Sequence, residues 1–154
     1  IPVQELLDAA GKYFKKLMKN RSERIELEIE SMEAKVIGDV NQLRFLLENL
    51  IDEALTVRED GVIRLQARKD NEYIRFLFTD TRREKSVEEL NQLFYPNLAR
   101  MTSGEKGELR GTEYLVCKQI IRDHDEFAGR RGCRINAEPA EGGGFTVYFT
   151  IPRR

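Results

Sequence analysis

The stretch VIGDVNQLRFLLENLIDEAL, residues 36–55, carries the pattern that decides the fold of this chain. Its second half repeats apolar residues at the three-and-four spacing that buries one face of a helix, at Leu46, Leu47, Leu50, Ile51, Ala54 and Leu55. Asp39 stands before this pattern with Gln42 three residues on, which is the spacing of a capping box. The sequence therefore predicts an amphipathic helix over residues 40–56.

Upstream of this helix, the sequence predicts a second helix and two strands. Pro2 suits the first turn of a helix over residues 3–18. The segment RIELEIE, residues 24–30, alternates apolar and charged residues, which predicts a strand with one face in water. A shorter strand is expected over residues 34–37.

Downstream, two further strands are expected at residues 61–69 and 73–80, joined by a turn at Asp70-Asn71. The segment SVEEL then begins a short helix, because Ser86 and Glu89 have capping-box spacing.

The last third of the chain begins with a polar, glycine-bearing stretch, residues 97–111, which indicates a mobile irregular loop. A helix over residues 112–124 follows. Two closing strands at residues 132–138 and 144–152 are joined by a turn at the glycines 142–144.

The predicted order is α-β-β-α-β-β-α-loop-α-β-β. Helices that bury one stripe and strands that mostly alternate indicate an α+β fold, a two-layer sandwich in which helices cover one face of a mixed, mostly antiparallel sheet. No internal repeat or linker divides the chain, so residues 1–154 are expected to form a single domain.

Composition excludes several classes of protein. The chain has 40% hydrophobic and 34% charged residues, which is typical of a globular protein and not of a disordered or fibrous one. Its 26 basic and 27 acidic residues are mixed, so we expect no nucleic-acid partner. No apolar run reaches the roughly 20 residues of a membrane span. Because Ile1 is not a natural start, we expect a C-terminal fragment of a longer cytoplasmic or membrane-anchored protein.

The two cysteines and the single histidine indicate no metal site. Cys117 and Cys133 cannot form a disulfide framework or a zinc site, and the apolar neighbours of Cys117 predict a buried thiol. A reduced, cytosolic setting fits them. His124 cannot form a multi-histidine metal site.

Several phrases, taken in order, resemble the ATP-binding domain of sensor histidine kinases, which belongs to the superfamily shared with gyrase B, heat-shock chaperones and mismatch-repair proteins. Residues 36–55 are similar to the family pattern V-x-G-D, R-L, N-L-x-x-N-A, and GGGFTVYFTIP, residues 142–152, to its closing G-x-G-T-x-F-x-F-x-L-P. Three further segments that carry the resemblance lie between them: FLFTDT, LNQLFYP and KQIIRDH. The resemblance implies the Bergerat fold, and it implies that the phosphoacceptor His lies on a separate helix outside this chain.

The resemblance also implies where a magnesium ion would bind. In the family an Asn of the helix after G-D holds Mg²⁺; here that position is Glu53, while Asn49 is the retained upstream Asn. A carboxylate can hold Mg²⁺, but beside phosphates two like charges at about 4 Å repel by about 4 kcal/mol at an effective dielectric of about 20. Glu53 is therefore either a metal ligand or a solvated helix residue.

The adenine-binding box, D-x-G-x-G in the family, reads DTRRE here. Asp80 and Thr81 match, and the resemblance implies that Asp80 accepts a hydrogen bond from the adenine amino group. Arg82 and Glu84 stand where glycines let the backbone approach the nucleotide. They are expected to fill the adenine pocket or displace the backbone, although Arg82 could instead reach a phosphate.

The phosphate-binding box, G-T-G-L-G-L in the family, aligns with LRGTEY, residues 109–114. Gly111 is retained, whereas Leu109 and Glu113 replace glycines whose bare amides would bind phosphate. Arg110 is a further candidate for offsetting phosphate charge.

Three hypotheses follow. The first is a degenerate histidine-kinase-type domain of a signalling protein, with ATP binding lost or weak and a regulatory role through protein contacts. The second is a working domain that binds ATP and Mg²⁺ and donates the γ-phosphoryl group to a His outside this chain; ATP and Mg²⁺ are cofactors under this hypothesis alone. The third is a structural or dimerising module. Expected partners are the other domains of the parent protein and a response regulator.

Overall fold

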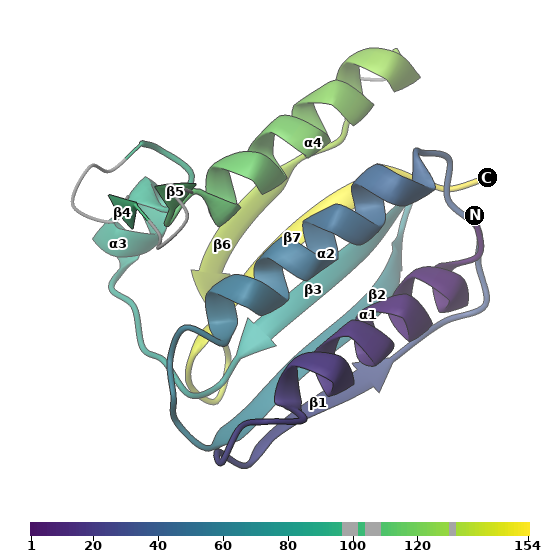
Figure 1. Cartoon of the computed structure of the whole chain (residues 1–154). Coiled ribbons are helices and arrows are strands. Elements are labelled where there is room, and N and C mark those ends of the chain that lie inside the picture. The colour runs from purple at the N-terminus through teal and green to yellow at the C-terminus, as the bar shows by residue number, and fades with distance from the viewer. Residues whose placement is uncertain (97–101, 104–108, 130–131) are drawn as a thin grey trace.

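A five-stranded sheet with helices on one face organises the molecule (Figure 1). The structure is a computed structural model that describes residues 1–96, 102–103, 109–129 and 132–154. The helices are α1 (Val3–Met18), α2 (Val40–Ala54), α3 (Val87–Gln92) and α4 (Glu113–Ala128). The strands of the sheet are β1 (Ile25–Glu30), β2 (Gly61–Asp70), β3 (Tyr73–Asp80), β6 (Ile135–Pro139) and β7 (Phe145–Pro152).

The sheet has the order β1-β2-β3-β7-β6. β1 runs parallel to β2, and the other three pairings are antiparallel. In the centre, Phe76 of β3 stands opposite Phe149 of β7, and their buried rings stack with centroids 5.0 Å apart. The predicted α+β sandwich with a mixed, mostly antiparallel sheet is confirmed.

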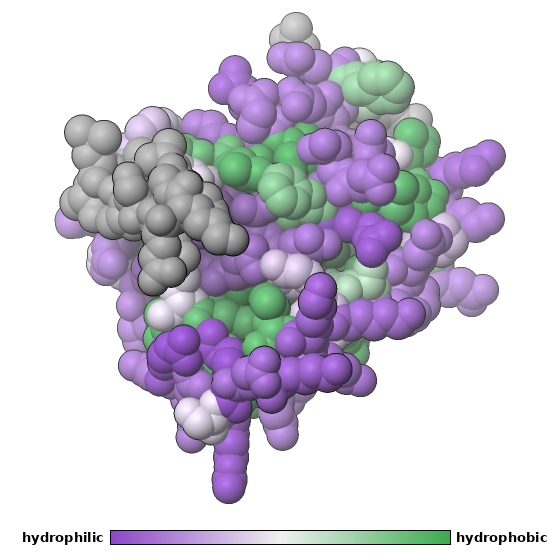
Figure 2. Space-filling view, viewed as in Figure 1, coloured by the Kyte–Doolittle hydropathy of each residue, from purple (hydrophilic) through white to green (hydrophobic). Residues whose placement is uncertain are grey.

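The apolar stripe of α2 forms the middle of the core. All six residues that predicted this helix are buried, and Asp39 caps it by accepting a hydrogen bond from the Gln42 N–H at 3.0 Å. Tyr13 of α1 donates to Asp52 of α2, which links the two helices. Figure 2 shows hydrophilic side chains over most of the helical face, with hydrophobic ones gathered along α2 and α4.

Helix and turn predictions agree closely with the structure. The helix predicted over residues 3–18 is α1, and the capping box of α3 is complete, with hydrogen bonds of 3.1 Å in both directions between Ser86 and Glu89. The turn between β6 and β7 has positive φ at each of the glycines 142–144, which explains why glycines are needed there.

Three predicted segments differ from the structure. Residues 34–37 form no strand; they make two isolated bridges, Pro2 to Lys35 and Val36 to Arg153, because their neighbours are the two ends of the chain and not a regular strand. Within the predicted loop 97–111, a short antiparallel pair is present, β4 (Thr102–Ser103) with β5 (Leu109–Arg110), and residues 97–101 and 104–108 lie outside the described part.

The third difference is the length of α4, which continues four residues beyond the predicted end and stops at Gly129 in the left-handed conformation. In the described part of the chain, no helix is long and apolar enough to cross a membrane.

Candidate functional site

Four charged side chains form one network between the end of β3 and the last turn of α2. Asp80 ends β3, and Arg82 and Arg83 follow it in the next turn, while Glu53 comes from α2. The side chains of Asp80 and Arg82 are each 1% exposed, and those of Arg83 and Glu53 are 12% and 15% exposed. Charges so far from water are stable only when they are paired and hydrogen-bonded.

Asp80 uses all of its hydrogen-bonding capacity within this network. Oδ1 accepts from the Arg82 backbone N–H at 3.0 Å and from Arg82 Nε at 2.9 Å. Oδ2 accepts from Arg82 Nη2 at 3.0 Å and from Arg83 Nε at 2.9 Å. An ionised carboxylate offers about four acceptor positions, so Asp80 has none left for a ligand.

The pKa of Asp80 is lowered. Burial by itself would raise this pKa, but the hydrogen bonds from the Arg82 side chain and backbone and the positive charge of Arg83 outweigh the burial. Asp80 is therefore the charged partner that holds both arginines.

Arg82 is saturated in the same way. Nη1 donates to the carbonyl oxygens of Val57 at 3.0 Å and Glu59 at 2.9 Å, and Nη2 donates to the Ala54 carbonyl at 2.7 Å. With its two bonds to Asp80, the guanidinium uses all five of its N–H groups. It thus donates to the last carbonyl of α2, that of Ala54, which also accepts from the Val57 N–H, and to two carbonyls of the segment that follows. The structure thus directs Arg82 to the backbone, and no donor remains for a phosphate.

Gly61 makes room for the Arg82 side chain. A Cβ at this position would lie 2.6 Å from Arg82 Cγ, and the φ of Gly61 is +146°, which side chains rarely adopt. A residue with a side chain at position 61 would therefore clash with Arg82 in its observed position.

Arg83 joins Asp80 to Glu53. Its Nη1 and Nη2 donate to the two carboxylate oxygens of Glu53 at 2.9 and 2.7 Å, a bidentate pair. Tyr114 of α4 donates its hydroxyl to Glu53 Oε2 as well. Glu53 is therefore not a solvated helix residue, and its oxygens are already used by α4 and the turn after β3.

Asn49 and Glu53 each form hydrogen bonds within the protein. Asn49 Nδ2 donates to the Phe45 carbonyl within α2 at 2.8 Å, and the side chain is buried. Over the residues that the structure describes, no group of three or more His, Cys, Asp or Glu side chains could hold a metal ion. The chain's own contacts at these two positions do not fit a magnesium site.

The other residues of the adenine-binding box also bond within the protein. Thr81 Oγ1 donates to the Val62 carbonyl at 2.6 Å, and Glu84 Oε1 accepts from the Gly144 N–H at 2.8 Å. Glu84 therefore fastens the β6–β7 turn to the segment after β3.

The phosphate-binding box is partly described. Gly111 has a φ of +81° and stands two residues before α4, which begins at Glu113. Leu109 and Arg110 belong to β5, and their side chains lie outside the described part, so the prediction for Arg110 stays a prediction. The carboxylate of Glu113 lies in the first turn of α4, where it suits the helix dipole.

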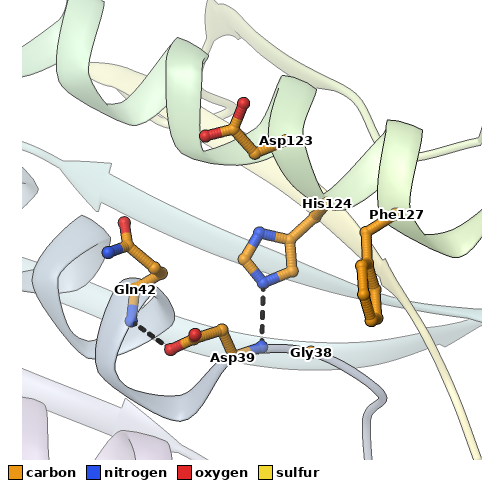
Figure 3. Close-up of a pocket in the computed structure, with 6 residues that line it drawn as sticks. All are labelled: Gly38, Asp39, Gln42, Asp123, His124 and Phe127. Atoms are coloured by element: carbon orange, nitrogen blue, oxygen red, sulfur yellow. Dashed lines mark hydrogen bonds between the residues drawn. The ribbon is translucent and has the colours of Figure 1, made fainter.

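A groove of about 370 Å³ lies at the far end of α2, between its N-terminus and α4 (Figure 3). His124 of α4 is buried beside it; Nδ1 lies 2.8 Å from the Ile120 carbonyl, and Nε2 accepts from the Asp39 N–H at 3.0 Å. Nδ1 must therefore carry the proton. His124 links α4 to the start of α2, and a Cβ at Gly38 would approach its ring to 3.0 Å.

Arg83 and Tyr114 are the members of the network that sequence reasoning missed. Arg83 falls at a position without a family role, and Tyr114 looks like one more apolar residue of α4. Burial raises the pKa of Tyr114, and the negative charge of Glu53 raises it further.

Replacing Asp80 with Asn should destabilise the protein at neutral pH and much less in acid. Because the pKa of Asp80 is lower in the folded state, its contribution to the free energy of unfolding is fully present above the unfolded value of about 3.9 and is lost as pH falls below it. The melting temperatures of wild type and Asp80→Asn, compared from pH 7 to pH 2.5, should converge below about pH 4. A constant difference would show that Asp80 is not the titrating partner of the arginines.

The chain matches a known protein family. Residues 38–154 match the family described as histidine kinase-, DNA gyrase B-, and HSP90-like ATPase. A comparison with curated proteins finds no match.

Solved structures share the fold at low sequence identity. The mycobacterial sensor histidine kinase MprB is 19% identical with a TM-score of 0.73, over 100% of this chain and 96% of that chain. The nucleotide-free catalytic domain of histidine kinase ThkA is 22% identical with a TM-score of 0.77, over 99% and 93%. ThkA in complex with the response regulator TrrA is 20% identical with a TM-score of 0.73, over 100% and 41%.

Proposed function

This chain belongs to the histidine kinase-, DNA gyrase B- and HSP90-like ATPase family, and within it we propose a degenerate domain of a signal-transduction protein. Its own side chains occupy the groups that would read ATP, and it acts through protein contacts. One observation carries the proposal: Asp80, at the position that matches the family's adenine-reading Asp, accepts four hydrogen bonds from Arg82 and Arg83.

Opening this network for a nucleotide is costly. Adenine would need an acceptor on Asp80, and that requires breaking hydrogen bonds between charged groups worth about 1.5–3 kcal/mol each. Moving Arg82 away would also remove its guanidinium as a donor to the carbonyls of Ala54, Val57 and Glu59. The loss is comparable with the roughly 8 kcal/mol of an entire micromolar complex.

Metal binding meets the same obstacle. Glu53, at the position that matches the family's metal-binding Asn, is held bidentately by Arg83, so Mg²⁺ would have to displace a paired guanidinium. Removing one partner of a buried ion pair leaves the other uncompensated. The site residues thus support internal pairing over cofactor binding.

The domain's role is regulatory. It passes the state of its parent protein to a partner, and a response regulator is the partner class that the ThkA–TrrA complex supports. The setting is the cytoplasm, which the two buried, unbridged thiols of Cys117 and Cys133 support.

Titration calorimetry with ATP and with AMPPNP, each with and without Mg²⁺, tests the proposal. We expect no binding at millimolar nucleotide and no nucleotide-dependent rise in melting temperature, since a ligand that binds the folded state must raise it. Micromolar, Mg²⁺-dependent binding would instead establish the second hypothesis, a working domain that donates the γ-phosphoryl group to a His elsewhere.

The variant Glu53→Asn sharpens this test. It restores the family's metal-binding side chain but leaves the Asp80–Arg82 contacts intact, so ATP binding should stay absent. Recovery of binding by this substitution alone would place the defect at the metal and not at the adenine pocket.

A further inference from the structure

The outer edge of β1 is one of the two edges of the sheet in the described part of the chain, and that of β6 is the other. β1 has β2 as its one neighbour in the sheet order, so one side of its backbone has no strand partner in the described part. The Gly61 N–H donates to the Arg24 carbonyl, and backbone groups alternate along a strand, so the N–H and C=O of Ile25, Leu27 and Ile29 face outward. Six residues at about 3.3 Å each make an edge about 20 Å long.

A groove of about 590 Å³ runs along this edge beneath α1. Residues from both faces of β1 line it, the apolar Leu27 and Ile29 and the acidic Glu26 and Glu28, so the groove lies alongside the strand itself. Figure 1 shows β1 at the border of the sheet with α1 above it. Ile29 is 38% exposed, and Gly11 of α1 approaches it closely.

The two sides of the groove differ in character. On the helix side, the apolar surface of Gly11, Phe14 and Ile29 lies among the charged residues Asp8, Lys12 and Lys15 of α1. On the outer face of the sheet, Glu26, Glu28 and Glu30 form a row of exposed carboxylates.

The charges of this row are incompletely neutralised. Glu28 pairs with Arg64 of β2 and Glu30 accepts from Gln66, whereas Glu26, opposite Val62, has no side-chain partner within the described residues.

We propose that the β1 edge docks an extended segment of a partner protein in which basic residues alternate with apolar ones. The segment adds a strand beside β1; main-chain hydrogen bonds supply affinity, and the alternating side chains supply specificity. Its basic residues meet the glutamate row, and its apolar residues enter the groove under α1. The groove shares no lining residue with the network of Asp80, Arg82, Arg83 and Glu53.

A second copy of this chain is a poor occupant. Pairing two β1 edges about a two-fold axis would set the glutamates of one copy opposite those of the other, and like charges directly opposed destabilise a strand pair. The row that prevents self-pairing is the same row that selects a basic segment.

Fluorescence anisotropy with three labelled peptides tests the proposal. The probes are Lys-Val-Lys-Ile-Lys-Val-Lys, its counterpart with Glu in place of Lys, and a peptide of the first composition with its lysines in one block. We expect the alternating basic peptide to bind at least tenfold more tightly than either of the others. If the peptide with its lysines in one block bound as tightly as the alternating one, strand addition would be overturned, because charge alone would then explain the affinity.

Two variants of the edge complete the test. Ile29→Pro removes an outward N–H at a position where an edge strand tolerates proline, and it should weaken binding at least tenfold. The double variant Glu26→Lys, Glu30→Lys keeps the Glu28–Arg64 pair and should reverse the preference toward the acidic peptide. If Ile29→Pro fails to fold, the result for the double variant Glu26→Lys, Glu30→Lys decides whether the β1 edge is the docking site.

The matched control reverses the same number of charges in the opposite edge strand, β6, and in the turn that follows it. Glu138→Lys with Glu141→Lys, both exposed, should change affinity less than twofold. An equal loss in this control would overturn the site. A dimer in sedimentation that Ile29→Pro abolishes would also overturn it, by showing that a second copy is the occupant.

Discussion

Replacing Arg82 with Met is expected to lower the free energy of unfolding by about 3–5 kcal/mol, because it removes one partner of a buried ion pair. The Asp80 carboxylate would keep two hydrogen bonds, from the Arg83 side chain and from the backbone N–H of residue 82. The carbonyls of Ala54, Val57 and Glu59 would lose the guanidinium as a donor. Urea unfolding at pH 7, followed by circular dichroism, measures the change as a lower midpoint at a constant m-value.

Arg83→Met is the matched control for this prediction. Arg83 lies nearer the solvent and touches no backbone carbonyl in the network, so its loss should cost about 1–3 kcal/mol. A loss below about 1 kcal/mol for Arg82→Met would contradict the view that the buried Asp80–Arg82 pair stabilises the fold. In the double variant Arg82→Met, Asp80→Asn, the loss in free energy of unfolding should be smaller than the sum of the two single losses, since both substitutions remove the same contacts.

Gly144→Ala is expected to destabilise the protein by about 2–4 kcal/mol, from positive φ and from overpacking together. Gly144 has a φ of +83°, and a Cβ there would lie 2.1 Å from the Asp80 carbonyl oxygen and 2.7 Å from Thr81 Cα. Both contacts are backbone, so β7 would have to move away from the end of β3. Thermal and urea unfolding both report this loss.

Gly142→Ala separates the two causes. Gly142 lies in the same turn with a φ of +88°, but a Cβ there would meet nothing within 4 Å. It should therefore cost about 1 kcal/mol, the conformational part alone. Equal losses in the two variants would show that close packing of β7 against Asp80 contributes nothing.

Most of the fold could be predicted from local patterns, because the spacing of apolar residues in a helix or strand indicates which of its faces is buried. The stripe of α2, the sequence alternation of β3 and β7, and the capping box at Ser86 depend on residues near in sequence, and the structure confirms the helices and strands that they predict. The strand prediction for residues 34–37 was wrong because the pairing of this segment is not local. Its pairing depends on where the two chain ends lie, which no local pattern records.

The sequence could predict where the candidate site lies, but not which of its side chains form hydrogen bonds with one another. The resemblance to a family pointed to Glu53, Asp80 and Arg82 as unusual or retained positions. It did not show that Arg82 turns to the end of α2, nor that Arg83 and Tyr114 converge on Glu53.

By itself, the sequence determined most of the elements and the two-layer arrangement, because hydrophobic period and turn residues act over a few positions. It also showed the positions at which the chain departs from the family pattern. The tertiary structure alone decided which charges meet. Tyr114 and Glu53 are 61 residues apart in the chain, and Arg82 and Ala54 are 28 apart. Their hydrogen bonds exist only once the sheet brings the end of β3 beside α2 and α4, since a side chain's partner is set by proximity in space.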